Sequence, residues 1–425
     1  MSTIFAPSSG LPPAAIAVIR ISGPQAFAAA RALAGDLPVP REARLRTLRD
    51  AAGEHLDTAL VLVFPAPNTA TGEDLVEFHV HGGRAVVAAV EAALAAQAGL
   101  RRAEPGEFTR RALANGRIDL AEAEGLGDLL SAETELQRRS ALAMADGTLS
   151  RRIATWRADL LGLAARLEAS LDFADEADVD PVLLDAIRTE GRAIAADIDA
   201  VLAAPSVDRL RDGIRVVLAG PPNSGKSTLL NALARREAAI VSPIAGTTRD
   251  RIEVPVARDG IPFVLIDTAG LRDTTDDAIE AIGIDRASQA IAGADIVLWL
   301  GDTAPPDAKM VRLHARADLP ERRSRGAGAE LAVSAATSAG IEELWALLVA
   351  RSRSLIPGAS EMALNQRQRT HCREALEALH DIDVQDELVV ADALRRANIA
   401  LARITGDTGI EAMLDALFAR FCIGK

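Results

Sequence analysis

The sequence is poor in cysteine and has no long apolar run. These features argue against a disulfide-rich secreted protein and against a membrane-spanning one. Its two cysteines in 425 residues, Cys372 and Cys422, have neither the spacing of a metal site nor that of a disulfide framework. No stretch approaches the ~18 consecutive apolar residues of a membrane helix. The first residues, MSTIFAPSSG, lack the basic segment and apolar core of a secretory signal. The pattern predicts a cytoplasmic protein without a membrane span.

Lysine is also scarce, although basic residues are not. Of 47 basic residues only three are lysine, namely Lys226, Lys309 and Lys425. Where arginine carries almost every positive charge, a retained lysine suggests a need for its compact ammonium group. The net charge of -13 argues against a protein coated with basic surface for nucleic acid, but a local basic patch can coexist with an acidic total.

The length and composition predict several globular domains. A chain of 425 residues exceeds the ~250 to 300 residues at which single cores stop growing. The hydrophobic fraction of 49% and the charged fraction of 25% are typical of globular proteins. Residues 1–118 alternate short β-branched runs with turns and helical segments, as in AAIAVIRISG, ALVLVFPAPN and DLVEFHVHGG followed by AVVAAVEAALAAQ. We expect an α/β or α+β domain there.

Two helical stretches enclose a segment of a different kind. From about Leu120 the chain reads as long helices, and one apolar stripe is formed by Leu142, Leu149, Ile153, Trp156, Leu160, Leu163, Leu167 and Leu171. A second helical stretch spans about 361–425. Between them, IRVVLAG, IPFVLIDTAG, ADIVLWLGD, AELAVSA and the helix IEELWALLVARS predict a doubly wound parallel sheet. We therefore predict an N-terminal α/β domain (1–118), a helical bundle domain (119–210 plus 357–425) and an inserted P-loop domain (211–356).

The inserted segment carries a phosphate-binding motif. Residues 220–227 read GPPNSGKS, directly after an apolar strand and before the helical LLNALARR. In this motif glycines let backbone N–H groups surround phosphate oxygens, Lys226 reaches the β and γ phosphates, and Ser227 offers its hydroxyl to Mg²⁺.

Two further motifs indicate a switch GTPase. GTTRD (246–250) can bring Thr248 to the metal, and DTAG (267–270) can place Asp267 in the Mg²⁺ shell and Gly270 at the γ phosphate. Position 271 is Leu, so the glutamine that orients water in Ras-like enzymes is absent there. Glu280 is a candidate for that role. Asn223 is a candidate ligand of a monovalent cation, or an asparagine that merely tolerates a turn.

Motifs inside and outside the inserted domain resemble the MnmE (TrmE) family of tRNA-modification GTPases over essentially the whole chain. They are GPPNSGKST, REAAIVSPIAGTTRD, LIDTAGLRD, NTATGEDLVEFHVHGG, AEPGEFTRRA, RIDLAEAE, LDFADEADVD and FCIGK. The resemblance implies a homodimer formed through a folate-binding N-terminal domain, with a 5-formyl or methylene tetrahydrofolate. It also implies an FAD-containing MnmG-type partner in a heterotetramer. The implied reaction is GTP- and K⁺-dependent addition of an aminomethyl or carboxymethylaminomethyl group to C5 of the wobble uridine of certain tRNAs.

The resemblance also implies site residues, carried over by position. The expected catalytic residues are Lys226, Arg272 and Glu280. The K⁺ ligands would be Asn223, Ser242, Ile244 and Thr247, and the Mg²⁺ ligands Ser227 and Thr248. Residues expected to contact GTP are Asn223, Ser224, Gly225, Lys226, Ser227, Thr228, Ser242, Pro243, Ile244, Ala245, Gly246, Thr247, Thr248, Asp267, Thr268, Ala269, Gly270, Asp318, Ser334, Ala335 and Ala336. The folate would contact Arg20, Glu77, Arg117 and Lys425.

Two of these positions have rival interpretations. Glu77, His79 and His81 alternate on one strand and could hold a metal, although a folate wall explains Glu77 better because the family fills the position of His79 with other types. Cys422 matches a near-terminal cysteine of the family, yet it is equally an inert cysteine.

The guanine motif departs from the family. The usual Asn-Lys-x-Asp stretch reads LHARADLPERR, so Ala315 replaces Asn, Arg316 replaces Lys and Asp318 is retained. Losing the hydrogen bonds of the asparagine would cost about 1 to 3 kcal/mol. We expect weaker guanine-nucleotide binding without a switch to ATP.

Other functions share the GTPase motifs. A regulatory or ribosome-assembly switch would have no need for the folate residues of the N-terminal domain. A membrane-coupled, K⁺-activated GTPase would need spans that this sequence lacks.

Overall fold

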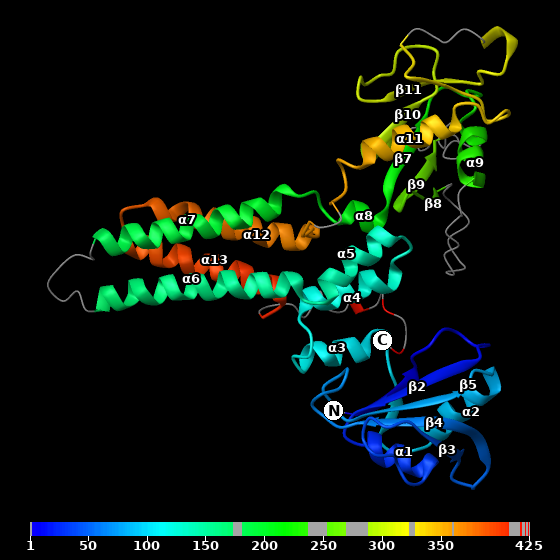
Figure 1. Ribbon diagram of the computed structural model, residues 1–425, viewed down its shortest axis with the longest axis vertical. Helices are drawn as coiled ribbons and strands as arrows, with labels where there is room; N and C mark the ends of the chain where they lie inside the picture. The colour runs from blue at the N-terminus through cyan, green and yellow to red at the C-terminus, as the bar shows by residue number, and fades with distance from the viewer. Residues whose placement is uncertain are drawn as a thin grey trace, which may run out of the picture. The chain divides into compact units, whose positions relative to one another are not determined.

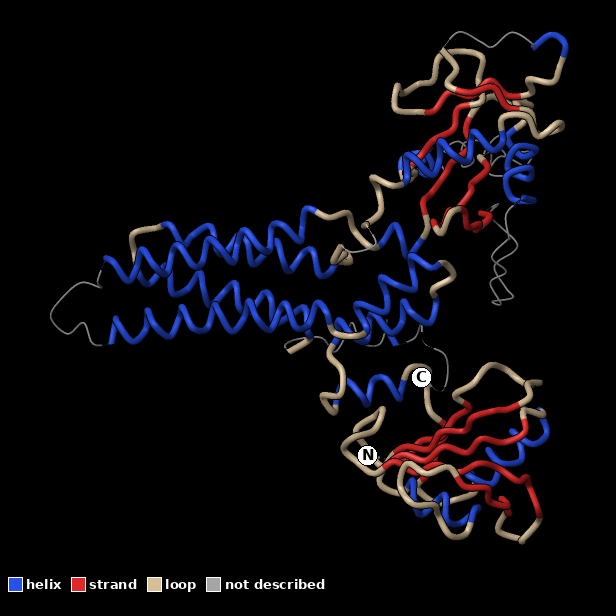
Figure 2. Tube along the Cα trace, in the orientation of Figure 1, coloured by secondary structure: helices blue, strands red, loops and turns tan. Residues whose placement is uncertain are grey.

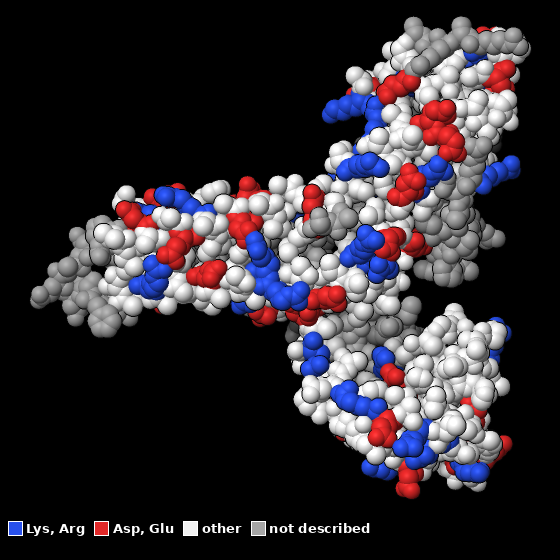
Figure 3. Space-filling view, in the orientation of Figure 1, with Lys and Arg blue, Asp and Glu red and all other residues white. Residues whose placement is uncertain are grey.

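The computed structural model describes residues 2–172, 181–236, 253–268, 288–322, 328–358 and 361–407, with residues 417, 418, 421 and 424. Its internal contacts divide the chain into two compact units. The first comprises Met1–Gly127, Met144–Thr155 and Leu401–Lys425, and the second comprises Asp128–Ala143 and Trp156–Ala400. Acidic and basic side chains are interspersed on the face of the described residues that Figure 3 shows.

The first unit is built on a six-stranded sheet with the order β3-β4-β5-β2-β1-β6. The elements are β1 (Thr3–Pro7), β2 (Ile16–Ser22), α1 (Ala26–Ala34), β3 (Arg44–Arg49), β4 (His55–Phe64), β5 (Leu75–His81), α2 (Arg84–Ala95), β6 (Leu100–Arg102) and α3 (Glu107–Ala114) (Figure 1). All neighbours are antiparallel except β1 and β6. The largely antiparallel sheet gives the α+β form of the predicted domain.

Strand β5 shows how alternation places functional side chains on this sheet. Val76, Phe78 and Val80 are buried in the core beneath α1 and α2. Because successive side chains of a strand point to opposite faces, Glu77 and His79 share the other face. The register sets Arg20 of β2 opposite Glu77.

Helices precede and follow the inserted segment. They are α4 (Leu120–Ser131), α5 (Glu135–Ala145), α6 (Thr148–Asp172), α7 (Pro181–Ala203), α12 (Gln366–His380), the 3-10 turn η2 (Asp381–Asp383) and α13 (Glu387–Thr405) (Figures 1 and 2). Helix α7 contacts α12. The indole of Trp156 donates to Asp197 Oδ2 at 2.6 Å, and the amide of Asn398 donates to the carbonyl of Arg157 at 3.1 Å. These bonds tie α6 to α7 and to α13.

The predicted apolar stripe is confirmed on α6 and wrong at one end. Its buried members are Leu149, Ile153, Trp156, Leu160, Leu163 and Leu167. Leu142 instead lies on α5 and is 37% exposed. Gly147, at φ 74°, separates α5 from α6, because a left-handed residue cannot continue a helix. The helical period therefore does not carry across it.

The second unit contains a sheet with the order β12-β11-β10-β7-β9-β8. Its elements are α8 (Asp208–Asp212), β7 (Ile214–Ala219), α9 (Lys226–Arg236), β8 (Glu253–Arg258), β9 (Ile261–Asp267), β10 (Ile296–Trp299), β11 (Val311–Ala315), η1 (Pro320–Arg322), β12 (Leu331–Val333) and α11 (Ile341–Ser352). The expected strands and α11 are present, and β8 and β11 are additional. Strand β8 is antiparallel to β9, so the sheet is not purely parallel as predicted. The reason is the two-residue turn Asp259–Gly260, both residues with positive φ, which permits only a hairpin.

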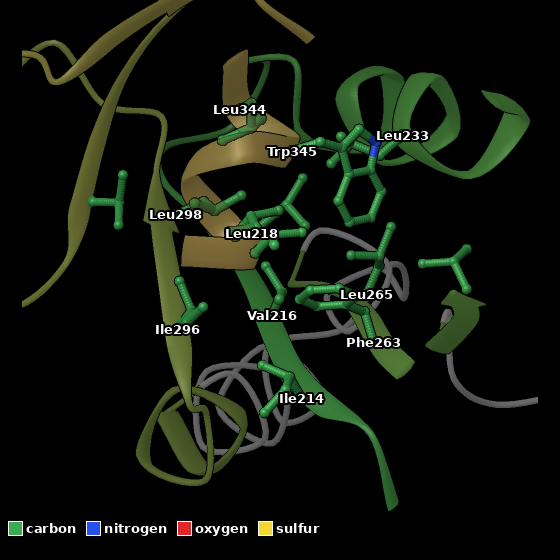
Figure 4. Close-up of a cluster of buried hydrophobic side chains, with 14 of the residues drawn as sticks. Ile214, Val216, Leu218, Leu233, Phe263, Leu265, Ile296, Leu298, Leu344 and Trp345 are labelled. Carbon is green, nitrogen blue, oxygen red and sulfur yellow. The ribbon is translucent and has the colours of Figure 1, made fainter. Parts of the chain in front are cut away.

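Strand β7 lies at the centre of this core. Its residues pair with β9 on one side and β10 on the other, and Ile214, Val216 and Leu218 are buried. Figure 4 shows them between the side chains of β9 and β10, with Trp345 of α11 nearby. The ring of Trp345 meets Phe263 edge-on, with centroids 5.3 Å apart. Burial on both faces explains the continuous apolar run of β7.

The chain enters and leaves the α/β segment at one place. The N–H of Val207 donates to the carbonyl of Leu364 at 3.1 Å. The guanidinium of Arg369 on α12 donates to the carbonyls of Leu202 and Ala204, each at 2.7 Å. These carbonyls belong to the last turn of α7 and the residue after it, which have no partner within the helix. These contacts hold the segment that enters the α/β domain beside the segment that leaves it, at the end of the helical bundle.

The stripe on α6 predicts the effect of two adjacent substitutions. Leu160→Ala removes a fully buried side chain and should lower the free energy of unfolding by about 2 to 5 kcal/mol. Leu161→Ala changes a side chain that is 57% exposed and should change it by less than about 0.5 kcal/mol. Urea unfolding followed by far-UV circular dichroism measures both. Equal losses for the two variants would contradict the assigned helix face.

Candidate functional site

The phosphate-binding motif forms the loop between β7 and α9. Gly220 and Gly225 have φ values of 146° and 96°, and Asn223 has φ 59°, a left-handed conformation that asparagine tolerates. The loop lies at the carboxyl end of β7, where the strand order reverses between β9 and β10. In open α/β sheets ligands bind at this switch point. Lys226 is 5% exposed, and its Nζ donates to the carbonyls of Gly220 and Pro221 at 3.1 and 2.8 Å.

Two groups expected around a divalent cation converge beside this loop. Ser227 lies in the first turn of α9, and Asp267 is the last residue of β9 and 1% exposed. The Ser227 hydroxyl donates to Asp267 Oδ2. The hydroxyl of Thr268 is used elsewhere, because it donates to the Leu218 carbonyl at 2.8 Å. A hydroxyl and a carboxylate in contact are an oxygen donor pair of the type that Mg²⁺ prefers.

A cavity of about 160 Å³ adjoins the phosphate loop. It is lined by Gly225, Thr228, Leu229, Ala315, Arg316, Asp318, Leu319, Val333, Ala335 and Ala336. Asp318 is fixed at its edge by the Ser334 hydroxyl, which donates to Oδ1 at 2.6 Å. The aliphatic stem of Arg316 lies over the loop, since Cγ is 3.5 Å from the position that a Cβ on Gly225 would take. The apolar residues Leu229, Leu319 and Val333 were not predicted, because their role depends on the fold and not on a motif.

The altered guanine motif leaves the loops after β11 and β12 connected. Ala315 ends β11 and is 4% exposed, so the position of the usual asparagine holds a methyl group. The N–H of Ala317 donates to the carbonyl of Val333 at 3.1 Å. Together with the bond between Ser334 and Asp318, this keeps the loop after β11 beside the loop after β12. Arg316 adopts φ 56°, which sets the backbone turn into Asp318.

In the first unit, the structure joins two of the predicted folate residues. Arg20 Nε and Nη2 donate to Glu77 Oε1 at 3.1 and 2.7 Å, and the two side chains are only 20% and 17% exposed. Burial acts to raise the pKa of Glu77, but hydrogen bonds and charge from Arg20 and His79 outweigh it and lower the pKa. Arg20 also lies over the ring of Phe108, 5.8 Å from its centroid. Phe108 belongs to the AEPGEFTRRA motif, but nothing in the sequence places it beside Arg20.

Arg117 lies beside Gly72, in the loop that precedes β5. It follows α3 and is exposed, with its N–H bonded to the Ala112 carbonyl at 2.8 Å. Gly72 has φ 79°, and a Cβ there would lie 2.9 Å from Asn115 Cβ and 3.2 Å from Arg117 Cγ, so the conformation and the space both favour glycine. The hydroxyl of Thr71, in the loop of Gly72, is 2.7 Å from the hydroxyl of Ser22. Ser22 lies on β2, two residues from Arg20.

The proposed metal array on β5 has other partners. His79 Nε2 is 3.3 Å from Glu77 Oε2. His81 is bonded to Asp57 through both its ring Nδ1 and its backbone N–H, each at 2.8 Å. Burial acts to raise the pKa of Asp57, but the hydrogen bonds from His81 and Thr58 lower it. Within the described part of the chain, no group of three or more His, Cys, Asp or Glu side chains could hold a metal ion.

Several predicted site residues lie outside the described residues. They are Ser242, Pro243, Ile244, Ala245, Gly246, Thr247, Thr248, Ala269, Gly270, Arg272, Glu280, Cys422 and Lys425. Among the helices that are described, none is long and apolar enough to cross a membrane.

Comparisons with known proteins match the chain over its whole length. A family model described as the GTP-binding protein TrmE N-terminus matches residues 3–117, and one described as the MnmE helical domain matches residues 120–422. The tRNA modification GTPase MnmE of Erythrobacter litoralis is 56% identical over 426 residues, covering 100% of both chains. That of Rhizorhabdus wittichii is 57% identical over 427 residues, covering 100% of this chain and 96% of the relative. That of Novosphingobium aromaticivorans is 54% identical over 435 residues, covering 100% and 99%.

Among solved structures, the G domain of the T. maritima FeoB iron transporter is 25% identical to the matched part. It covers 33% of this chain and 98% of that chain with a TM-score of 0.24, which supports no structural comparison.

Proposed function

The chain belongs to the MnmE family of tRNA modification GTPases, and we propose from this that it hydrolyses GTP to drive modification of the wobble uridine of certain tRNAs. The product would carry an aminomethyl or carboxymethylaminomethyl group at C5. The single observation that supports this best is that one chain combines a phosphate loop beside Asp267 and Asp318 with a partly buried Arg20–Glu77 pair in a separate unit. A switch protein needs the first of these and has no use for the second.

The nucleotide would be held by the phosphate loop, Lys226, Asp318 and Arg316. Backbone N–H groups of the phosphate loop and the N-terminus of α9 would bind the phosphates. The ammonium of Lys226, now bonded to loop carbonyls, would exchange those bonds for the β and γ phosphate oxygens. Asp318 would accept from the guanine ring, and Arg316 would stack over it. Glu280 would orient water, with Arg272 nearby.

Two cations would complete the nucleotide site. Ser227, Asp267 and Thr248 would hold Mg²⁺, directly or through water, and the contact between Ser227 and Asp267 fits this donor set. Asn223, Ser242, Ile244 and Thr247 would hold K⁺. Bound there, the cations supply positive charge against the negative charge that develops on the transferred phosphoryl group. The side chains of the loop serve to fix these charges in place before the reaction.

The Arg20–Glu77 pair would bind a tetrahydrofolate derivative in the 5-formyl or methylene form. Glu77 stays ionised because its pKa is lowered, so it can accept hydrogen bonds from a pterin amide edge. Arg20, Arg117 and Lys425 suit the carboxylates of a glutamate tail. The low exposure of the pair supports this role, because charge-assisted bonds strengthen away from water.

The proposed assembly follows the family. The N-terminal domain (1–118) would form the homodimer, and the helical domain (119–210 plus 357–425) would carry the G domain (211–356). An FAD-containing MnmG-type partner would complete a heterotetramer that acts on tRNA in the cytoplasm. Cys422 would lie in the tail of the helical domain.

A tRNA assay separates this function from a ribosome-assembly or regulatory switch. Transfer RNA from a strain that lacks the gene should lose the modified wobble uridine, and the wild-type gene should restore it, as nucleoside mass spectrometry measures. Glu77→Gln should fail to restore it while GTP hydrolysis persists, because the carboxylate serves the folate and not the nucleotide. Glu42→Gln, whose ion pair with Arg44 is exposed, should restore it. Unchanged nucleosides in the deletion strain would favour the switch.

The cation role of Asn223 can be separated from its turn role. GTP hydrolysis should be at least about tenfold faster in KCl than in NaCl at equal ionic strength, and ATP hydrolysis should be negligible in both. Asn223→Gly keeps a residue that adopts φ 59° but removes the side-chain oxygen, so the K⁺ advantage should disappear. Asn231→Ala on the exposed side of α9 should keep it. Retention of K⁺ activation in Asn223→Gly would assign Asn223 to the turn alone.

Restoring the guanine motif should tighten nucleotide binding. Ala315→Asn places an amide at the wall of the base cavity, where it can bond the loops that Asp318 and Ser334 now join. Recovery of about 1 to 3 kcal/mol corresponds to about 5- to 150-fold higher affinity for GDP and GTP. Titration with a fluorescent guanine nucleotide measures it, and Ala304→Asn in an exposed loop is the control. An unchanged affinity would show that the existing contacts already suffice.

A further inference from the structure

Two phenylalanines near the end of the chain are buried within the first unit. Phe418 and Phe421 are 3% and 6% exposed, and their ring centroids are 5.7 Å apart. The guanidinium of Arg110 on α3 lies over Phe418, 5.5 Å from its centroid. A Cβ on Gly106, the residue before α3, would lie 2.7 Å from the Phe418 carbonyl oxygen. These contacts hold Phe418 against α3; the described residues 417, 418, 421 and 424 are here called the tail.

Gly424 lies in close contact with the end of β1. It has φ 97°, and a Cβ added there would overlap the Pro7 carbonyl oxygen and lie 2.8 Å from the Pro7 carbonyl carbon. Its own carbonyl accepts a hydrogen bond from the Ser8 hydroxyl at 2.8 Å. The obstructing atoms are backbone, which cannot rotate away as a side chain can. Both the conformation and the space therefore require glycine.

The surface that receives Gly424 belongs to the strand pair that carries Arg20. Pro7 of β1 pairs with Ile19, and the preceding pair is Ala6 with Arg20. Beyond the strand, the Ser8 N–H donates to the Val18 carbonyl at 2.7 Å. The backbone of Gly424 thus rests one residue pair from Arg20.

We propose that Gly424 is a positioning residue that seats the tail on Pro7 and Ser8, and that binding of a reduced pterin carrying a glutamate tail depends on this seat. The inference rests on the proposed folate function of Arg20 and Glu77. Position 424 must lack a side chain to fit against Pro7, and the Ser8 hydroxyl holds the Gly424 carbonyl by a hydrogen bond.

The test compares Gly424→Ala with Gly10→Ala in the full-length protein. Gly10 lies two residues after Ser8, and a Cβ there would meet nothing within 4 Å. Gly424→Ala should weaken the affinity for 5-formyltetrahydrofolate at least about tenfold in equilibrium dialysis, whereas Gly10→Ala should leave it unchanged. The amide hydrogens of the peptide that contains Phe421 and Gly424 should exchange faster in Gly424→Ala alone. The melting temperature and the rate of GTP hydrolysis should not change.

A second pair of variants tests the hydrogen bond. Ser8→Ala removes the donor to the Gly424 carbonyl and should weaken folate binding by a few fold, and Ser8→Thr keeps a hydroxyl and should restore it. Wild-type folate affinity or unchanged tail exchange in Gly424→Ala would overturn the inference and leave the proposed function standing. If the wild-type protein or the Glu77→Gln variant shows that folate does not bind at this pair, the proposed function fails, and the dependence of binding on the seat fails with it.

Discussion

The burial of strand β7 is the constraint on which the nucleotide site depends. Because β7 has a hydrogen-bonded neighbour on both edges and apolar side chains packed on it, its end cannot move without breaking the core. The phosphate loop begins at that end, and Asp267 reaches it from the adjacent strand. The loop can therefore hold residues in left-handed conformations, since the surrounding sheet offsets the local strain. Rigid strands and a strained connection are the two parts of one site.

Local signals in the sequence were sufficient to predict the elements that are specified by a short run of neighbouring residues. The glycines and lysine of the phosphate motif, the apolar run of β7 and the period of α11 each specify a structure within about ten residues. Strand β8 was missed because its six residues, EVPVAR, carry a proline and only weak alternation. It is an edge strand that the Asp259–Gly260 turn connects to β9 in an antiparallel hairpin. Leu142 was misplaced because a period gives no warning where Gly147 interrupts it.

Contacts between distant segments could not be read from the sequence. The pairing of Arg20 with Glu77 depends on the register of β2 with β5, and a shift by one residue would turn Glu77 to the other face. The same holds for Phe108 beside Arg20. The guanine motif gives the opposite case. The missing asparagine at position 315 suggested loosened loops, whereas the bonds from Ala317 to Val333 and from Ser334 to Asp318 still join them. Two loops that the asparagine of the motif usually joins can also be joined by other hydrogen bonds.

The single crossing point at Val207 and Leu364 has a consequence for how such a chain could arise. Two backbone groups that are 3.1 Å apart can be linked by a very short connection, so the helical bundle does not need the segment between them to bring α7 and α12 together. An ancestral bundle could have acquired the nucleotide-binding cassette by one recombination event within a surface turn. The bundle keeps its own closure at this point, because Arg369 of α12 bonds the carbonyls at the end of α7.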